Sequence, residues 1–132
     1  MGTFSGLAEA QEYFKADRFA TLNGITLDAL SDEGAVCSVT LTDGHRNAMG
    51  GVMGGVIFTL ADLAFAAAAN NDHRSTVALD MNVHFLSGTK GDRLIAVSKK
   101  IKSGQTTSVY EITVSDDTGR QVALIIGTGY KL

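Results

Sequence analysis

The hydrophobic pattern of the chain centres on one long apolar run from Val56 to Ala69. Only Thr59 and Asp62 interrupt its aliphatic, alanine and phenylalanine residues. A helix that is apolar on nearly every side is usually enclosed by other structure. The run therefore predicts one buried helix, which the polar stretch 70–74 should end. It is too short to cross a bilayer, because a membrane span needs about 20 apolar residues.

The pattern before and after this helix predicts mainly strands. Leu7–Phe14 has helical spacing and predicts a short amphipathic helix with a cap at Ser5. Period-two alternation on both sides of the turn at 31–34 predicts a β-hairpin. Four more strands are expected after the long helix, at Val77–Phe85, Leu94–Ile101, Ser108–Val114 and Val122–Tyr130.

This order of elements is neither a βαβ repeat nor a sandwich, and it indicates an α+β fold in which one antiparallel sheet wraps around the long helix. The sheet should cover the helix on one side only. The apolar run Ala66–Ala69 then invites contact with a second copy, so we expect at least a dimer.

Composition limits the possible functions. A chain of 132 residues predicts a single domain over 1–132, and 45% hydrophobic residues without proline predict a compact fold. The net charge of −3 argues against nucleic acid or an anionic membrane as partner and favours a small-molecule ligand. The single Cys37 excludes an internal disulfide and is expected to be a small buried residue. With no signal-peptide pattern at the N-terminus, we expect a cytoplasmic protein.

Asp62 is the first candidate for chemistry, because burial of an isolated carboxylate costs on the order of several kcal/mol. Such a group needs partners or a raised pKa, which is typical of functional sites, although a structural ion pair is the alternative. Gly54 and Gly55 stand where the helix should begin. Unpaired N–H groups at a helix N-terminus can hold a carbonyl that becomes an oxyanion, and the alternative is that these glycines only allow close packing.

Several of these residues together resemble the hotdog-fold thioesterases, most closely the phenylacetate-degradation (PaaI-like) type. The matching positions are His45 and Asn47, Gly50, Met53-Gly54-Gly55, Asp62, and the stretch Leu79–Leu86. The resemblance implies that Asn47 is the positioning residue, Gly54 the oxyanion glycine and Asp62 the catalytic carboxylate. It also implies an acyl-coenzyme A (acyl-CoA) substrate, a free acid and CoA as products, and a dimer or tetramer. No metal or cofactor is expected beyond the CoA of the substrate.

Further residues are candidate substrate contacts, namely His45, Met53, Gly55, Phe58, Ala78 and Lys100. Met53 stands where many relatives of the resembled family have a histidine, and Ala78 where some have a serine or threonine. Met53 and Phe58 could line an apolar pocket for a small aryl or medium-chain acyl group, unless Phe58 belongs to the core. Lys100 could meet CoA phosphates, unless it is an ordinary surface charge. His45 could instead be a solvated loop residue.

The residues leave some alternatives open. Asp62 could attack the thioester directly or activate a water. A hydratase or dehydratase of the same fold, or a non-catalytic acyl-CoA-binding module, are the other functions considered. The spacing adds one constraint: Asp62 lies eight residues after Gly54, or ~12 Å along one helix at ~1.5 Å per residue. Both residues can serve one substrate only if they come from different subunits with antiparallel helices.

Overall fold

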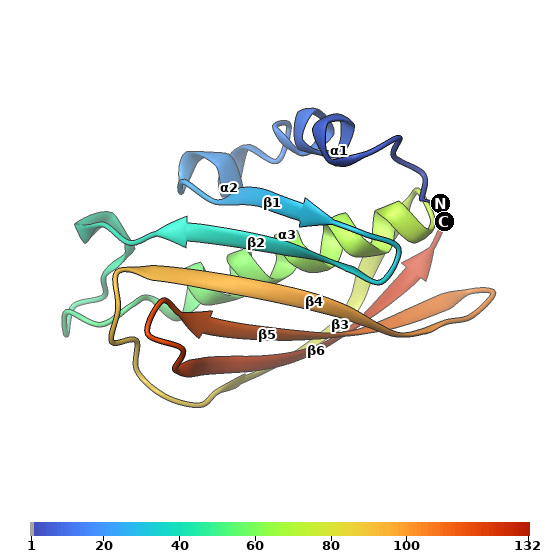
Figure 1. Ribbon diagram of the computed structural model, residues 1–132. Helices are drawn as coiled ribbons and strands as arrows, with labels where there is room; N and C mark the ends of the chain where they lie inside the picture. Colours follow the sequence, from blue (N-terminus) through green and yellow to red (C-terminus); the bar gives the residue numbers. More distant parts are fainter. Residues whose placement is uncertain (1) are drawn as a thin grey trace.

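The computed structural model describes residues 2–132 and has the α+β architecture that the pattern predicts, with a curved antiparallel sheet around one long helix (Figure 1). The elements are α1 (Leu7–Phe14), α2 (Arg18–Leu22), β1 (Thr26–Leu30), β2 (Gly34–Thr40), a 3₁₀ turn η1 (Asp43–His45), α3 (Gly54–Asp72), β3 (Thr76–Phe85), β4 (Arg93–Ser103), β5 (Thr107–Asp116) and β6 (Gln121–Lys131). The long helix of the prediction is α3.

The six strands lie in the order β1-β2-β4-β5-β6-β3, and every neighbouring pair is antiparallel. The chain leaves β2, runs along α3 across the inner face, and returns as β3 at the opposite edge of the sheet (Figure 1). The outer edge of β1 is covered by the N-terminal helices, where the Gln11 side chain donates a hydrogen bond of 2.8 Å to the Leu27 carbonyl. β3 is the other edge strand of the sheet, and most of its side chains are exposed.

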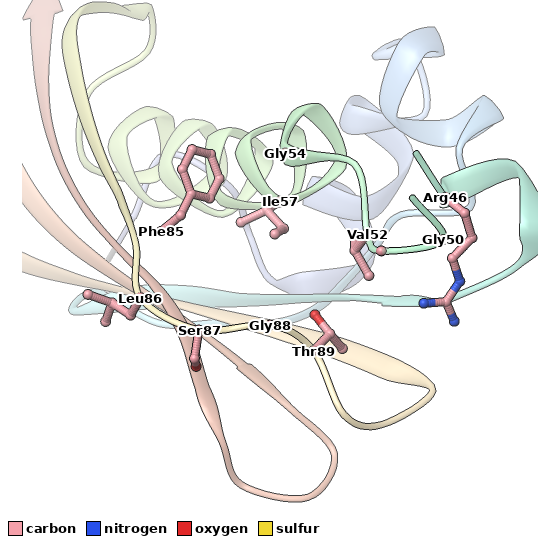
Figure 2. Close-up of a pocket in the computed structure, with 11 residues that line it drawn as sticks. Arg46, Gly50, Val52, Gly54, Ile57, Phe85, Leu86, Ser87, Gly88 and Thr89 are labelled. Carbon is pink, nitrogen blue, oxygen red and sulfur yellow. The ribbon is translucent and has the colours of Figure 1, made fainter. Parts of the chain in front are cut away.

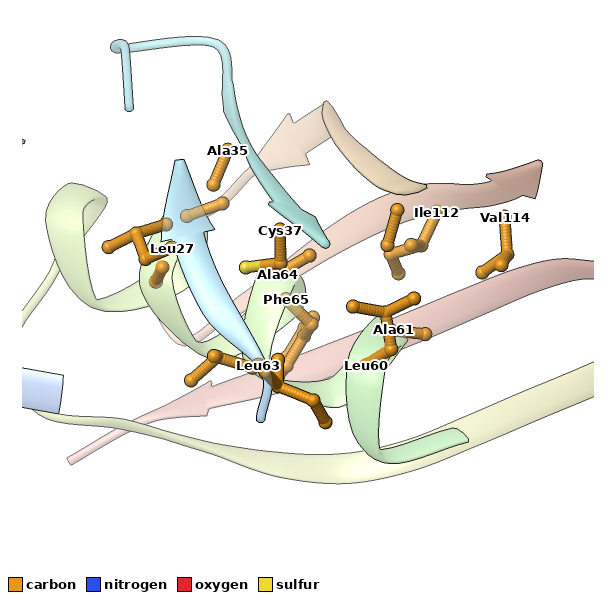
Figure 3. Close-up of a cluster of buried hydrophobic side chains, with 14 of the residues drawn as sticks. Leu27, Ala35, Cys37, Leu60, Ala61, Leu63, Ala64, Phe65, Ile112 and Val114 are labelled. Carbon is orange, nitrogen blue, oxygen red and sulfur yellow. The ribbon is translucent and has the colours of Figure 1, made fainter. Parts of the chain in front are cut away.

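The core lies between α3 and the inner face of the sheet, and Figure 3 shows side chains of α3 meeting those of β1, β2 and β5. Phe65 of α3 meets Tyr110 of β5 edge to face, with the ring centroids 5.7 Å apart. The Ser98 hydroxyl on β4 donates to the Ala64 carbonyl at 2.8 Å. Cys37 is fully buried, and burial raises the pKa of its thiol, which confirms the prediction of a small core residue.

The long helix has its expected limits, but other details of the helical part differ from the prediction. α3 begins at Gly54 and ends at Asp72, inside the polar stretch 70–74, so Asn70 and Asn71 are still helical; both are buried and bind backbone groups of neighbouring segments. The Asn70 side chain, for example, accepts a hydrogen bond of 2.9 Å from the Thr76 amide. Ser5 does not cap α1: Gly6 is the N-cap, and the Ser5 hydroxyl binds Glu9 instead. α2 was not predicted.

The part of α3 that the sheet leaves uncovered also differs from the prediction. Ala67–Ala69 are buried within their own subunit, so only Ala66 of the alanine run is open to a second copy. Gly55, Thr59, Asp62 and Ala66 follow one another at helical spacing and are all incompletely buried. These four residues form the open stripe of α3. No helix within residues 2–132 has the length and apolar character needed to cross a membrane.

Candidate active site

The N-terminus of α3 offers two free backbone donors. Met53 is the N-cap, with no side-chain cap, and the amides of Gly54 and Gly55 donate to no acceptor within the part of the chain described. A Cβ atom at Gly54 would lie 3.2 Å from the Phe85 ring, whereas at Gly55 its nearest neighbour would be 3.9 Å away. The free amides and the positive end of the helix dipole suit a developing oxyanion.

Asn47 shapes the loop that leads into α3. Its side-chain oxygen accepts hydrogen bonds from the amides of Met49 (3.0 Å) and Gly51 (3.1 Å), as expected of a turn asparagine. Its side-chain NH₂ group donates to no other group among residues 2–132. Asn47 therefore holds the turn with one atom and keeps a donor for a ligand with the other.

The structure corrects the expectations for His45. The residue is buried, and both ring nitrogens are engaged: Nδ1 accepts from the Thr42 amide at 2.9 Å, and Nε2 donates to the Asn23 carbonyl at 2.7 Å. Its carbonyl accepts from the Met53 amide at 2.9 Å. His45 is thus neither a solvated loop residue nor a free ligand contact, and it ties the loop before α3 to the segment after α2.

Asp62 lies on the open stripe of α3, partly buried, and forms no hydrogen bond or ion pair within the residues described. Burial raises the pKa of its carboxyl group, and the negative charge of Asp17 raises this pKa further. Asp17 is the N-cap of α2, and burial raises its pKa as well. Asp62 is therefore a stronger base than an ordinary aspartate. Asp17 was missed, although an aspartate before a short helical stretch is a signal for an N-cap.

Gly54 and Asp62 are not brought together within one subunit. Both lie in the continuous helix α3, so their backbones are ~12 Å apart along its axis. Asn47 lies on the Gly54 side, since the backbone of its loop is hydrogen-bonded next to the helix start. One subunit thus carries two separate halves of the predicted site.

Two cavities border the paired glycines. The larger, of about 490 Å³, is shown in Figure 2 and is lined by Arg46, Gly50, Gly51, Val52, Gly54, Ile57, Phe85, Leu86, Ser87, Gly88 and Thr89. The smaller, of about 310 Å³, is lined by Phe19, Asn23, Ile25, Gly44, Arg46, Met53, Gly55, Val56, Phe58 and Thr59. Gly54 lines the first cavity, Gly55 the second and Arg46 both, so the two cavities flank the start of α3. The sequence did not single out Arg46, Phe85 or Thr89.

The remaining predicted contacts are more distant. Ala78 is exposed on the edge strand β3, opposite Gly129 of β6. Lys100 forms an ion pair of 2.9 Å with Asp72, the last residue of α3, and this end of the helix is ~27 Å from Gly54. Lys100 is therefore not at the glycine site of its own subunit. No three His, Cys, Asp or Glu side chains gather as possible metal ligands in the described part of the chain.

Comparison with known proteins finds related sequences and structures. Residues 49–123 match the thioesterase superfamily. The acyl-coenzyme A thioesterase PaaI of Escherichia coli is 32% identical over 93% of this chain and 89% of its own length. Human acyl-coenzyme A thioesterase 13 is 28% identical over 83% of this chain and 81% of its own. The solved structure of E. coli PaaI, from the phenylacetic acid degradation operon, superposes with a TM-score of 0.88 at 31% identity, covering 93% of this chain and 90% of that one.

Proposed function

Because the chain belongs to the thioesterase superfamily, we propose that it hydrolyses acyl-CoA thioesters to a free acid and CoA at a site shared between two subunits. The observation that carries this proposal is the pair of unbonded amides at Gly54 and Gly55, two adjacent residues that each line a different cavity. A thioester carbonyl held there would have its acyl group in one cavity and its CoA arm in the other. A substrate with an acyl group and a CoA arm, as in the names of the acyl-coenzyme A thioesterase relatives, fits this division.

The second subunit is expected at the free edge of β3. This edge strand exposes apolar side chains, including Val77 (46% exposed), Leu79 (65%) and Phe85 (59%). An exposed apolar edge strand is a template for pairing with another chain. Two copies joined at β3 about a two-fold axis would bring the open stripes of their α3 helices together, running antiparallel. Asp62 of one subunit could then face Gly54 of its partner.

The chemistry follows from this placement. The Gly54 and Gly55 amides would donate to the carbonyl oxygen as its negative charge grows. Asp62 of the other subunit would accept a proton from a water that attacks the carbonyl carbon, or would itself attack to form an anhydride that water then hydrolyses. In either route the C–S bond breaks, and CoA leaves as the thiol after it takes up a proton. The free NH₂ group of Asn47 would orient the attacking group or the carbonyl.

The smaller cavity is suited to the acyl group. Its walls include Met53, Phe58, Phe19 and Ile25, which are apolar, and its volume of about 310 Å³ fits a small aryl or medium-chain group. Met53 here takes the position of the histidine that many similar enzymes have. Arg46, which lines both cavities, is the one charged residue among the described residues of this lining.

A panel of acyl-CoA thioesters tests the function directly. Thiol release is followed with a thiol-reactive dye, with phenylacetyl-CoA, hexanoyl-CoA and acetyl-CoA as substrates. The proposal predicts steady turnover that is fastest for the aryl or medium-chain substrate. Saturable binding of these thioesters, measured by calorimetry, without thiol release would show a binding module instead. Addition of water to an unsaturated acyl-CoA without thiol release would show a hydratase.

A further inference from the structure

Arg46 combines an unpaired side chain with a place in a cavity wall, whereas Arg18 and Arg120, whose side chains also form no hydrogen bond or ion pair within residues 2–132, line neither of the two cavities. Arg46 is exposed and forms no hydrogen bond or ion pair within residues 2–132. By contrast, Arg74 donates to Thr3 and lies 4.0 Å from the centre of the Phe4 ring, and Arg93 donates to Ser38. Arg46 lines the 490 Å³ cavity, at the end away from Phe85 in Figure 2, and also borders the smaller cavity. The cavity thus has one free guanidinium group.

Thr89 contributes a second polar group to the same cavity. Its hydroxyl oxygen is inaccessible to solvent and has no hydrogen-bond partner in the described part of the chain. An unsatisfied buried hydroxyl is costly, so it indicates a position where a ligand atom completes the site. The loop that carries it is fixed, because the Asp116 carboxylate accepts hydrogen bonds from the amides of Lys90 (2.8 Å) and Gly91 (3.3 Å).

We infer that this cavity binds the CoA arm of the substrate, with Arg46 on the pyrophosphate and the Thr89 hydroxyl donating to the pantetheine chain. The inference rests on the proposed function. A guanidinium group binds phosphate oxygens with two parallel hydrogen bonds, and at the exposed mouth of a cavity it meets a charged group that remains partly in water. This assignment places the phosphate contact at the glycine end of α3 instead of at Lys100.

The dimensions agree with this assignment. Arg46 and Val52 form an antiparallel β-bridge, and Val52 lies two residues before Gly54, so the Arg46 backbone is within about 13 Å of the glycine. The pantetheine arm from sulfur to the first phosphorus has about thirteen bonds, which is the number in about four residues of extended chain, or ~15 Å. With the carbonyl at Gly54, the pyrophosphate would therefore lie within reach of the Arg46 side chain.

Matched substrates and variants separate the two contacts. Hexanoyl-CoA, hexanoyl-dephospho-CoA and hexanoyl-pantetheine share the acyl group and the arm, but only the first two have the pyrophosphate. Arg46→Gln should lower kcat/KM roughly 10-fold or more for both CoA substrates and leave hexanoyl-pantetheine unchanged. Thr89→Val should lower kcat/KM about 3-fold or more for all three. Arg120→Gln, which removes the same charge from the exposed β5–β6 turn, is the control and should change none.

Each other outcome overturns the inference. Equal loss on the pantetheine substrate would mean that Arg46 does not act through phosphate. Loss with CoA but not with dephospho-CoA would move the contact to the 3′-phosphate, and no loss at all would remove Arg46 from binding. Calorimetry with free CoA gives a readout without turnover, and here Arg46→Gln should weaken binding by a similar factor. If the wild type hydrolyses no thioester, the proposed function fails, while the calorimetry still tests Arg46.

Discussion

The carboxylate of Asp62 should cost the protein stability while it supports activity. Asp62 has no hydrogen-bond or ion-pair partner within residues 2–132, and burial together with the charge of Asp17 raises its pKa. Asp62→Asn removes the charge and keeps the shape of the side chain. The variant should therefore be more stable than the wild type at neutral pH and should lose turnover by at least ~10²-fold, the scale of a lost base or nucleophile.

The size of this stability gain and its dependence on pH follow from the coupling between proton binding and folding. Each unit by which the folded pKa exceeds the unfolded value lowers the unfolding free energy by ~1.4 kcal/mol once the pH is above both. Because the pKa is raised, the folded wild type binds the proton more tightly, so its stability falls as the pH rises from about 4 through the folded pKa. Asp62→Asn does not show this fall. The variant's gain in unfolding free energy over the wild type is absent at low pH and complete at neutral pH. A gain of ~1 kcal/mol corresponds to about 3–5 °C in Tm.

Urea unfolding at a series of pH values between 4 and 8, at fixed protein concentration, measures this advantage for both proteins. The reasoning is refuted if Asp62→Asn is less stable than the wild type, or if the difference between the two does not change with pH. Either result would mean that the carboxylate is paired in the assembled protein, which would contradict the raised pKa but not the shared site. Unchanged turnover would separately remove Asp62 from the mechanism.

Two further substitutions test the surroundings of Asp62 and Gly54. Asp17→Asn removes the negative charge that raises the Asp62 pKa, so the acid limb of the profile of kcat/KM against pH should move to lower pH, and an unmoved limb would contradict the coupling. Met53→His should change the rate or the acyl preference with little change in Tm, because the Met53 side chain is 51% exposed and lines the smaller cavity. Met49→His, at a position 92% exposed and outside both linings, is its control, and a collapsed melting transition of Met53→His alone would show that Met53 is packed core.

The fold could be predicted from the sequence because hydrophobic periodicity sets it. The run Val56–Ala69 has the length of a helix and no polar face, and the later strands Val77–Phe85 and Ser108–Val114 alternate clearly. The order of these elements leaves few arrangements other than a sheet around a helix. What the pattern missed was α2, Arg18–Leu22, whose five residues are too short to show a helical period.

Polar residues in the site were harder to interpret, because their role depends on partners distant in the sequence. His45 seemed available in a polar loop, but Asn23, beyond the β-hairpin, takes one of its ring nitrogens. The polar stretch 70–74 does contain the end of α3, at Asp72, but the sequence does not show that Asn70 is buried and accepts a hydrogen bond from the Thr76 amide. Arg46 gave no signal at all, since an arginine in a loop is ordinary until a cavity is found next to it.

The alanine run Ala66–Ala69 shows that apolar character alone does not predict which surface is exposed. Ala66–Ala69 suggested a contact with a second copy from apolar character alone, but the subunit's own sheet buries Ala67–Ala69. The surface that is open to a partner comes instead from β3, whose apolar side chains alternate as in a core strand. Sequence alternation predicts the strand correctly, and only the strand order shows that it lies at an edge.

Complementation of two inactive variants tests most directly whether Gly54 and Asp62 of different subunits form one site. Asp62→Asn removes the carboxylate half. Asn47→Asp removes the donor on the glycine half and keeps the side-chain oxygen that holds the turn to Met49 and Gly51. The two proteins carry different mass tags and are mixed, dissociated and reassociated, and mass spectrometry verifies the exchange of subunits.

A shared site predicts that activity returns in the mixture. In each mixed dimer one site has both defects and the other has none, so random pairing restores about a quarter of wild-type turnover, since half of the dimers are mixed and each has one intact site of two. Each variant taken alone through the same treatment should stay inactive. A mixture with verified exchange that remains as inactive as its components would contradict the shared site.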